Sequence, residues 1–152
     1  MEILIKENES QKSEIAVKTE VLNQLEGKVK EWVEDHVDKR KLWFSSDFLP
    51  SDEKMNDDQE TNYKQLRERS RGIKDEVRVA VALNLLTEEG LPHFHRLIAQ
   101  HLGDRSFWSK WNNMWTAEED RHGAVIRDYV RDAHLFSFRE VELMQFHYIE
   151  SG

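Results

Sequence analysis

Residues 115–123 read WTAEEDRHG, and they place Glu119 and His122 three residues apart in a segment whose apolar residues recur at helical spacing. Side chains at this separation are neighbours on one face of a helix. A carboxylate followed by an imidazole three residues later is the unit from which helical bundles build iron sites. The motif therefore predicts a helix that carries a candidate pair of metal ligands.

A second carboxylate, Glu88, lies 31 residues before Glu119 in another strongly helical segment. The turn signal Gly103-Asp104 separates the two segments, so two antiparallel helices joined there would let Glu88 face Glu119 and His122. A complete di-iron carboxylate site takes a Glu from each of two helices and a Glu-x-x-His from each of two more. The sequence has no second Glu-x-x-His, so it encodes half of such a site.

Spacing alone leaves three interpretations open for Glu119 and His122: metal ligands, a surface ion pair, or a buried hydrogen-bonded pair. The apolar residues around them favour a metal. A buried Glu88 facing a buried Glu119 would repel it unless a proton or a cation lay between them, and a divalent metal satisfies both carboxylates. Iron or manganese is favoured, because the site is rich in carboxylates and the chain has no cysteine.

The composition indicates a single domain over residues 1–152 and excludes several classes of function. With 38% hydrophobic and 34% charged residues, the chain combines enough apolar side chains for a core with a highly charged surface. The net charge of -8 argues against nucleic-acid binding, because a phosphate backbone would be repelled. The absence of cysteine excludes disulfides, iron–sulfur clusters and thiolate chemistry.

The N-terminal residues have too short an apolar run for a signal peptide and too many acids for an organellar transit peptide. No apolar run approaches the length of a membrane span. A chain without cysteine is also compatible with a reducing compartment. We therefore expect a cytoplasmic protein with no membrane-spanning segment.

Only six glycines and two prolines occur, and the helical spacing of apolar residues predicts an all-α fold. The first helix is expected over residues 10–37, with a core-facing stripe of Ile15, Leu22, Leu25, Val29, Trp32 and Val33. Residues 42–58 are expected to form a loop that is attached to the bundle by Phe44, Phe48 and Leu49. A shorter helix is expected over residues 59–71.

One helix is expected over residues 74–102, with an inner stripe of Val77, Val81, Asn84, Glu88 and Leu91. Gly90 and Pro92 are the residues that would loosen or kink it. The next helix is expected over residues 106–134, with one side formed by Trp111, Trp115, Glu119, His122, Ile126 and Tyr129. Ser137 and Glu140 form a predicted capping box that opens a last helix through Ile149, with Gly152 as its C-cap glycine.

Other conspicuous residues have plainer interpretations. His93 and His95 are two residues apart, so they point to different faces of a helix and are interpreted as surface or packing residues. Two groups of basic residues are ordinarily solvated surface, but in an acidic protein they are also candidate docking sites for an acidic partner. They are Lys39, Arg40 and Lys41, and Lys64, Arg67, Arg69, Arg71 and Lys74.

Several ordered motifs together resemble the soluble acyl-carrier-protein (acyl-ACP) desaturases, a family with a ferritin-like helical bundle. The resemblance covers roughly residues 30–152 and is carried by four pieces: Trp43 with Asp47-Phe48-Leu49-Pro50, then Leu66-Arg67-Glu68-Arg69, then Thr87-Glu88-Glu89-Gly90-Leu91-Pro92, then residues 115–123. Gly90 and Asp120 stand where Ala and Asn are commoner in the family, and both look tolerable. As a set, these pieces are far more specific than an isolated Glu-x-x-His.

The resemblance implies that Glu88, Glu119 and His122 are iron ligands. It implies that Thr87 lies next to the iron cluster, where it handles oxygen or protons, and that Trp43 passes electrons toward the metal. The implied activity is insertion of a cis double bond into a fatty acyl chain carried on acyl carrier protein. The implied requirements are two iron ions, O₂ as co-substrate and electrons from a ferredoxin.

The chain resembles only the N-terminal half of the family fold, because family members are expected to be roughly twice as long and their second half brings the other Glu and the second Glu-x-x-His. Three interpretations stay open. The chain is a desaturase whose remaining half is absent from this polypeptide, or a homodimeric ferritin-like metal-binding or oxidase protein in which two copies complete the site. Alternatively, it is an inactive helical remnant that packs with a partner and binds no metal.

Overall fold

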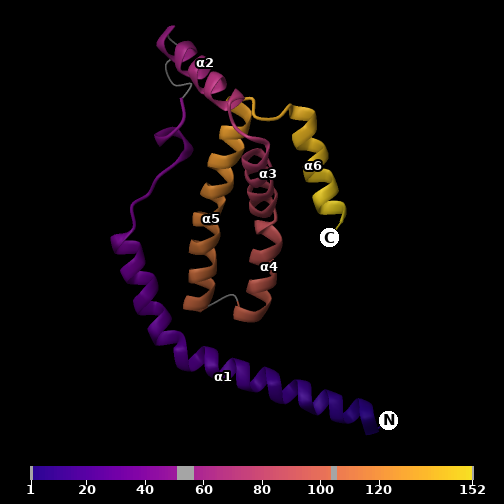
Figure 1. Ribbon diagram of the computed structural model, residues 1–152. Coiled ribbons are helices and arrows are strands. Elements are labelled where there is room, and N and C mark those ends of the chain that lie inside the picture. Colours follow the sequence, from indigo (N-terminus) through magenta and orange to yellow (C-terminus); the bar gives the residue numbers. More distant parts are fainter. Residues whose placement is uncertain (1, 51–56, 104–105, 152) are drawn as a thin grey trace. The chain divides into compact units, whose positions relative to one another are not determined.

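The described part of the protein is entirely helical. The computed structural model describes residues 2–50, 57–103 and 106–151, with residues 2–13 and 57–59 described by their backbone alone. These ranges form six α-helices, one 3-10 turn and no strand (Figure 1), which confirms the all-α prediction. The elements are α1 (Glu2–Lys39), η1 (Ser45–Asp47), α2 (Asp57–Arg71), α3 (Asp75–Glu89), α4 (Leu91–Leu102), α5 (Phe107–Asp132) and α6 (Phe138–Glu150).

The chain divides into two compact units, residues 1–40 with 97–113 and residues 41–96 with 114–152. In the first unit, the start of α5 is tied to α1. The Trp108 indole donates to the Leu22 carbonyl at 3.0 Å, and the Phe107 amide donates to the Glu26 carboxylate at 2.6 Å. Val29 of α1 is buried, at 3% exposure.

The predicted apolar stripe of the first helix is wrong over much of its length. Ile15 is 64% exposed and Trp32 is 60% exposed, whereas Val29 and Val33 are buried. The helix also begins well before residue 10. Helical spacing determines which side chains share a face, but a face is buried only where a partner helix lies against it.

The second unit contains α3 and the 114–132 part of α5, which run antiparallel. Arg78, near the start of α3, contacts Leu135, which follows the end of α5. Glu88 and Glu89, at the end of α3, lie against Gly123 and Arg127 in the body of α5, as expected for antiparallel helices. Helix α6 packs beside α3 (Figure 1). The core of this unit is formed by Leu85, Val130 and Leu135, with half-buried neighbours Ile73, Val81, Ile126, Tyr129, Phe136 and Val141.

The helix expected over residues 74–102 is broken in two at Gly90. In an unbroken helix the N–H of residue 92 would donate to the Glu88 carbonyl, but Pro92 has no N–H. The amides on either side use tighter three-residue bonds instead: Gly90 donates to Thr87 at 3.1 Å and His93 to Gly90 at 3.0 Å. The break follows Glu88 by two residues.

The inner stripe predicted for this helix is also only partly internal. Leu91 is 6% exposed and Val81 is half-buried, as expected. Val77, however, is 49% exposed, and Asn84 is exposed as well. The face of α3 that carries Glu88 is therefore open along much of its length.

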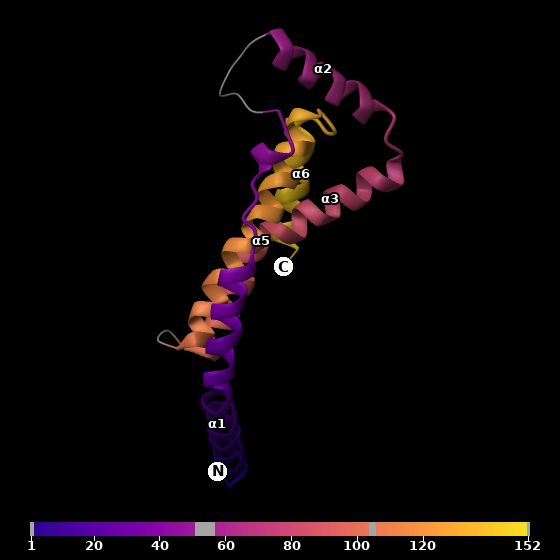
Figure 2. The ribbon, with the colours of Figure 1, turned by 90° about the vertical axis from the view of Figure 1, so that its left-hand side faces the viewer.

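A polar corner links the α2–α3 turn, visible in Figure 2, to the end of α5. The Arg78 guanidinium donates to the carbonyls of Leu135 at 2.7 Å, Ser70 at 3.2 Å and Ile73 at 3.3 Å. The buried Ser70 hydroxyl donates to the Ala133 carbonyl at 2.6 Å. These bonds tie the end of α2 and the start of α3 to the segment that follows α5.

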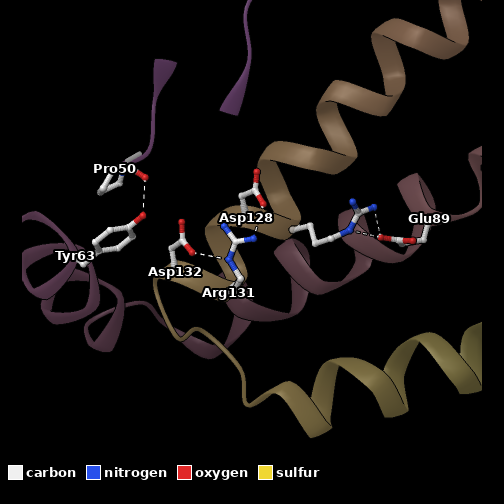
Figure 3. A network of polar contacts seen from close by, with 7 residues as sticks. Pro50, Tyr63, Glu89, Asp128, Arg131 and Asp132 are labelled. Carbon is white, nitrogen blue, oxygen red and sulfur yellow. Dashed lines mark hydrogen bonds and ion pairs between the residues drawn. The ribbon is translucent and has the colours of Figure 1, made fainter. Parts of the chain in front are cut away.

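The loop and the last helix give a mixed outcome. Phe44 and Phe48 are 53% and 67% exposed, so they do not attach the loop as predicted. The Tyr63 hydroxyl instead donates to the Pro50 carbonyl at 2.8 Å (Figure 3). Residues 51–56 and the predicted C-cap Gly152 lie outside the described residues. The Ser137–Glu140 capping box is confirmed at the start of α6. No described helix has the length and apolar content of a membrane span.

Candidate metal centre

The three metal ligands predicted from the sequence come together between α3 and α5. Glu88 lies in the last turn of α3, and Glu119 and His122 lie on successive turns in the middle of α5. One ligand atom from each lies within 4.8 Å of the other two. Among the described residues, this is the only group of three or more His, Asp or Glu side chains close enough to hold one ion.

The close approach of the two helices here depends on Gly123. A Cβ atom on this buried residue would lie 3.2 Å from Cβ of Glu88, tighter than nine in ten real Cβ contacts. A glycine therefore lets α3 bring the Glu88 side chain up against α5 beside His122.

His122 and Glu119 contact each other directly. Nδ1 of His122 lies 2.7 Å from Oε2 of Glu119, and the two side chains are 46% and 29% exposed. This distance places an imidazole nitrogen and a carboxylate oxygen, both possible metal ligands, side by side on α5.

The electrostatics of the cluster favour a cation. Burial raises the pKa of Glu88 above its ordinary value, the negative charge of Glu119 raises it further, and His122 acts in the opposite direction. A nearby positive charge would favour the ionised form of Glu88 and so oppose this rise of its pKa. The two carboxylates and the imidazole therefore form a site at which a bound cation would be electrostatically favourable.

Trp43 covers the exposed imidazole. Its ring is stacked on His122 with centroids 5.6 Å apart and an angle of 14° between the planes. The Arg121 guanidinium lies over the same indole, 5.2 Å from the centroid, and Phe48 meets it edge-on at 5.7 Å. The sequence singled out Trp43, and the structure places it against one of the three cluster residues.

Thr87, which the sequence also singled out, makes its hydrogen bonds within its own helix. Its exposed hydroxyl donates to the carbonyls of Leu83 and Asn84, both at 2.9 Å, so it is bonded to its own helix.

Two contacts that flank the cluster were not predicted from the sequence. Nδ1 of His95 lies 2.6 Å from the Thr116 hydroxyl, one turn before Glu119.

The second missed contact lies on the other side, where Nε of Arg127 donates to the Glu89 carboxylate at 2.8 Å (Figure 3). Helical spacing could have revealed the second contact, because Arg127 is eight residues from Glu119 on the same helix, whereas His95 lies beyond the break at Gly90. A polar link between the two helices therefore lies on each side of the cluster.

Comparison with known proteins agrees with the motifs. The family model described as fatty acid desaturase matches residues 17–152. DesA1 of Mycobacterium tuberculosis, named as an acyl-[acyl-carrier-protein] desaturase, is 37% identical over 118 residues, which are 73% of this chain and 32% of that protein. The chloroplastic acyl-[acyl-carrier-protein] desaturase 6 of Oryza sativa is 34% identical over 148 residues, 89% of this chain and 34% of that protein.

The seed-specific chloroplastic stearoyl-[acyl-carrier-protein] 9-desaturase of Brassica napus is 31% identical over 143 residues, 89% of this chain and 35% of that protein. The chain thus spans about a third of the length of the curated relatives it matches. The match to the family model covers most of the chain and includes all three cluster residues. The chain belongs to the acyl-[acyl-carrier-protein] desaturase family of fatty acid desaturases.

Proposed function

We propose that this chain carries one half of the di-iron centre of an acyl-ACP desaturase. The proposed reaction is O₂-dependent insertion of a cis double bond into a fatty acyl chain on acyl carrier protein, with electrons from a ferredoxin-type donor. One observation carries the proposal: Glu88, Glu119 and His122 converge on one point in a chain that belongs to this family.

The donor set fits iron. Carboxylate oxygens and an imidazole nitrogen are the ligands of non-haem iron and manganese sites, and no thiolate is present to favour another metal. Two donors bound to one ion at about 2.1 Å each lie at most about 4.2 Å apart. The three ligand atoms lie within 4.8 Å of one another, so the side chains would move closer together on binding one ion.

The residues of this chain have separable proposed roles. Glu88 and Glu119 would supply oxygen ligands from the two facing helices, and His122 a nitrogen ligand. When bound, the iron pair would activate O₂ so that hydrogen can be removed from an unactivated methylene. Trp43, stacked on His122, is the proposed route by which electrons reach the centre. Thr87 is proposed to handle oxygen or protons there, which requires its hydroxyl to leave the Leu83 and Asn84 carbonyls.

Metal analysis after anaerobic reconstitution of the 152-residue chain with Fe(II) tests the ligand assignment. We expect stoichiometric iron, and loss of most of it in Glu88→Gln and His122→Ala. Matched controls are Glu142→Gln on α6 and His93→Ala on α4, which change the same residue types away from the cluster and should retain iron. Iron content that is unchanged in the cluster variants, or absent from the folded parent chain, would contradict the proposal.

The reaction itself is tested by supplying the iron-loaded chain with stearoyl-ACP, ferredoxin, a ferredoxin reductase and O₂. The expected product is an acyl chain two mass units lighter, with one double bond, formed only when O₂ and reductant are both present. Iron binding without any such product under these conditions would reduce the assignment to a metal-binding protein of the desaturase family.

A further inference from the structure

Trp43 lies in a segment that has no regular secondary structure to fix it. Residues 40–44 are neither helix nor strand, and the side chains of Leu42 and Phe44 are 59% and 53% exposed. Trp43 itself is half-buried. The place of its ring is therefore determined by the contacts that Trp43 makes.

Arg121 of α5 makes two of these contacts. Its guanidinium lies over the Trp43 ring, 5.2 Å from the centroid, and its Nη1 donates to the Trp43 carbonyl at 3.4 Å. A planar guanidinium can lie against an aromatic ring and still donate hydrogen bonds from its edge. One side chain therefore contacts both the ring and the backbone of Trp43. The next residue, His122, is the one on which the same ring is stacked.

Arg121 is itself held in place. Its Nη2 lies 3.8 Å from Oε1 of Glu118, one turn earlier on α5, and the two side chains are 14% and 22% exposed. A charge so far from solvent needs partners within the protein. The Glu118 carboxylate, the Trp43 carbonyl and the face of the indole are such partners.

We propose that Arg121 is a positioning residue that holds the Trp43 ring against His122. The edge-on contact from Phe48 comes from the same loop, so it does not fix that loop to α5. The two contacts from Arg121 do, because they join ring and carbonyl to a helix that also carries His122. The importance of this position for electron delivery rests on the role proposed above for Trp43, but the position itself is measurable without metal.

The test is ¹⁹F NMR of the metal-free 152-residue chain labelled with 5-fluorotryptophan. The chain has five tryptophans, and the signal of Trp43 is the one that Trp43→Phe removes. In Arg121→Gln we expect this signal to move toward the chemical shift of free 5-fluorotryptophan. Its shift difference between H₂O and D₂O should rise, because the ring leaves the imidazole and meets solvent. The signals of the other tryptophans should stay in place.

The matched control is Arg131→Gln, which removes an arginine of the same helix that pairs with Asp128 and Asp132 (Figure 3). It should leave the Trp43 signal unchanged. Circular dichroism establishes that each variant is folded. If Arg121→Gln does not fold, Arg121→Met takes its place, because it keeps the apolar part of the side chain and removes the charge.

An unmoved Trp43 signal in a folded Arg121 variant would overturn the inference. Displacement of all the tryptophan signals together would overturn it as well, because that result would indicate a general loosening of the fold.

The outcomes for iron are separate. A chain that binds no iron overturns the proposed function, while the ¹⁹F signals of the metal-free chain still decide the positioning of Trp43. In the iron-loaded chain, reduction by a ferredoxin-type donor should be slower in Arg121→Gln and in Trp43→Phe, at unchanged iron content. Unchanged rates in both variants would remove the electron-transfer role from Trp43 and leave its positioning by Arg121 standing.

Discussion

At Gly123 a single missing carbon keeps the two ligand-bearing helices close. In an ordinary helix interior, replacing glycine by alanine stabilises the helix by up to about 1 kcal/mol, because the unfolded chain loses freedom that the folded one does not use. Here the added Cβ would lie 3.2 Å from Cβ of Glu88, so α3 or α5 must give way by a few tenths of an ångström. At Gly123, helix propensity therefore favours alanine, whereas packing against Glu88 favours glycine.

We expect Gly123→Ala to lower the Fe(II) affinity of the cluster without the usual gain in stability. The control is Gly27→Ala on α1, where an added Cβ meets no atom within 4 Å and should raise the unfolding free energy by up to about 1 kcal/mol. Urea unfolding and Fe(II) titration of both variants measure the difference. Equal stabilisation of the two variants with unchanged Fe(II) affinity would show that α3 and α5 accommodate the added Cβ at position 123 without disturbing the cluster.

The convergence of Glu88, Glu119 and His122 could be predicted from the sequence, because helical spacing and one turn suffice to bring them together. The surroundings could not. Trp43 reaches His122 from 79 positions away in the chain, and no local pattern encodes such a contact. The hydroxyl of Thr87 bonds to its own helix, a choice of rotamer that spacing does not determine.

At the scale of elements, helix ends and breaks decide where the prediction succeeded. The 59–71 and 106–134 helices and the capping box at Ser137 were close to the observed elements. The break at Gly90 was foreseen only as a kink. The corner held by Arg78 was not foreseen, because its bonds join segments 57 residues apart through backbone carbonyls that carry no sequence signal.

Arg78→Ala should destabilise the second unit strongly. The guanidinium makes three hydrogen bonds to carbonyls at the corner, and bonds from a charged donor contribute about 1.5–3 kcal/mol each when measured singly. Because they share one side chain, we expect a total loss of about 2–4 kcal/mol in urea unfolding. The control Arg139→Ala removes a 75%-exposed arginine on α6 and should cost less than about 1 kcal/mol. Equal losses of unfolding free energy in the two variants would show that the Arg78 hydrogen bonds do not stabilise the corner.

The capping box predicts how the stability of α6 depends on pH. Hydrogen bonds from the side chain and backbone of Ser137 lower the pKa of Glu140 below its ordinary 4.5. Since the folded pKa is lower than the unfolded one, the stabilisation is complete above about pH 4.5 and is lost as pH falls through the folded value. Glu140→Gln should be less stable than the parent at pH 7 and nearly equal to it at low pH, measured by urea unfolding at both values. A constant difference would contradict the assignment.

At the scale of the whole molecule, the net charge of -8 makes any basic surface stand out. Lys64, Arg69 and Arg71 on α2 are exposed. Arg67, by contrast, is half-buried: its Nε donates to the Asp132 carbonyl at 3.1 Å and its guanidinium lies over the Tyr63 ring. Arg67 therefore belongs to the folded structure, and Lys64, Arg69 and Arg71, together with the exposed Lys74, remain the candidate carrier-binding residues of this group.

Reversing Lys64 and Arg71 together to Glu should weaken binding of the acidic acyl carrier protein and flatten its salt dependence, because favourable charge pairs are lost. Affinity at two ionic strengths, measured by isothermal titration, gives both quantities. The matched control is Lys18→Glu on α1, which reverses another exposed lysine. Affinity that falls equally in the control would indicate a general charge effect instead of a docking surface on α2.

The stacking of Trp43 on His122 also gives the protein a built-in optical reporter. An indole 5.6 Å from the imidazole is close enough for a paramagnetic ion bound there to quench its emission. The tryptophan fluorescence of the chain should therefore fall as Fe(II) is added, and Trp43→Phe should remove the part of that fall that saturates with the site. Occupancy of the centre could then be followed in real time, in dilute solution and without a label.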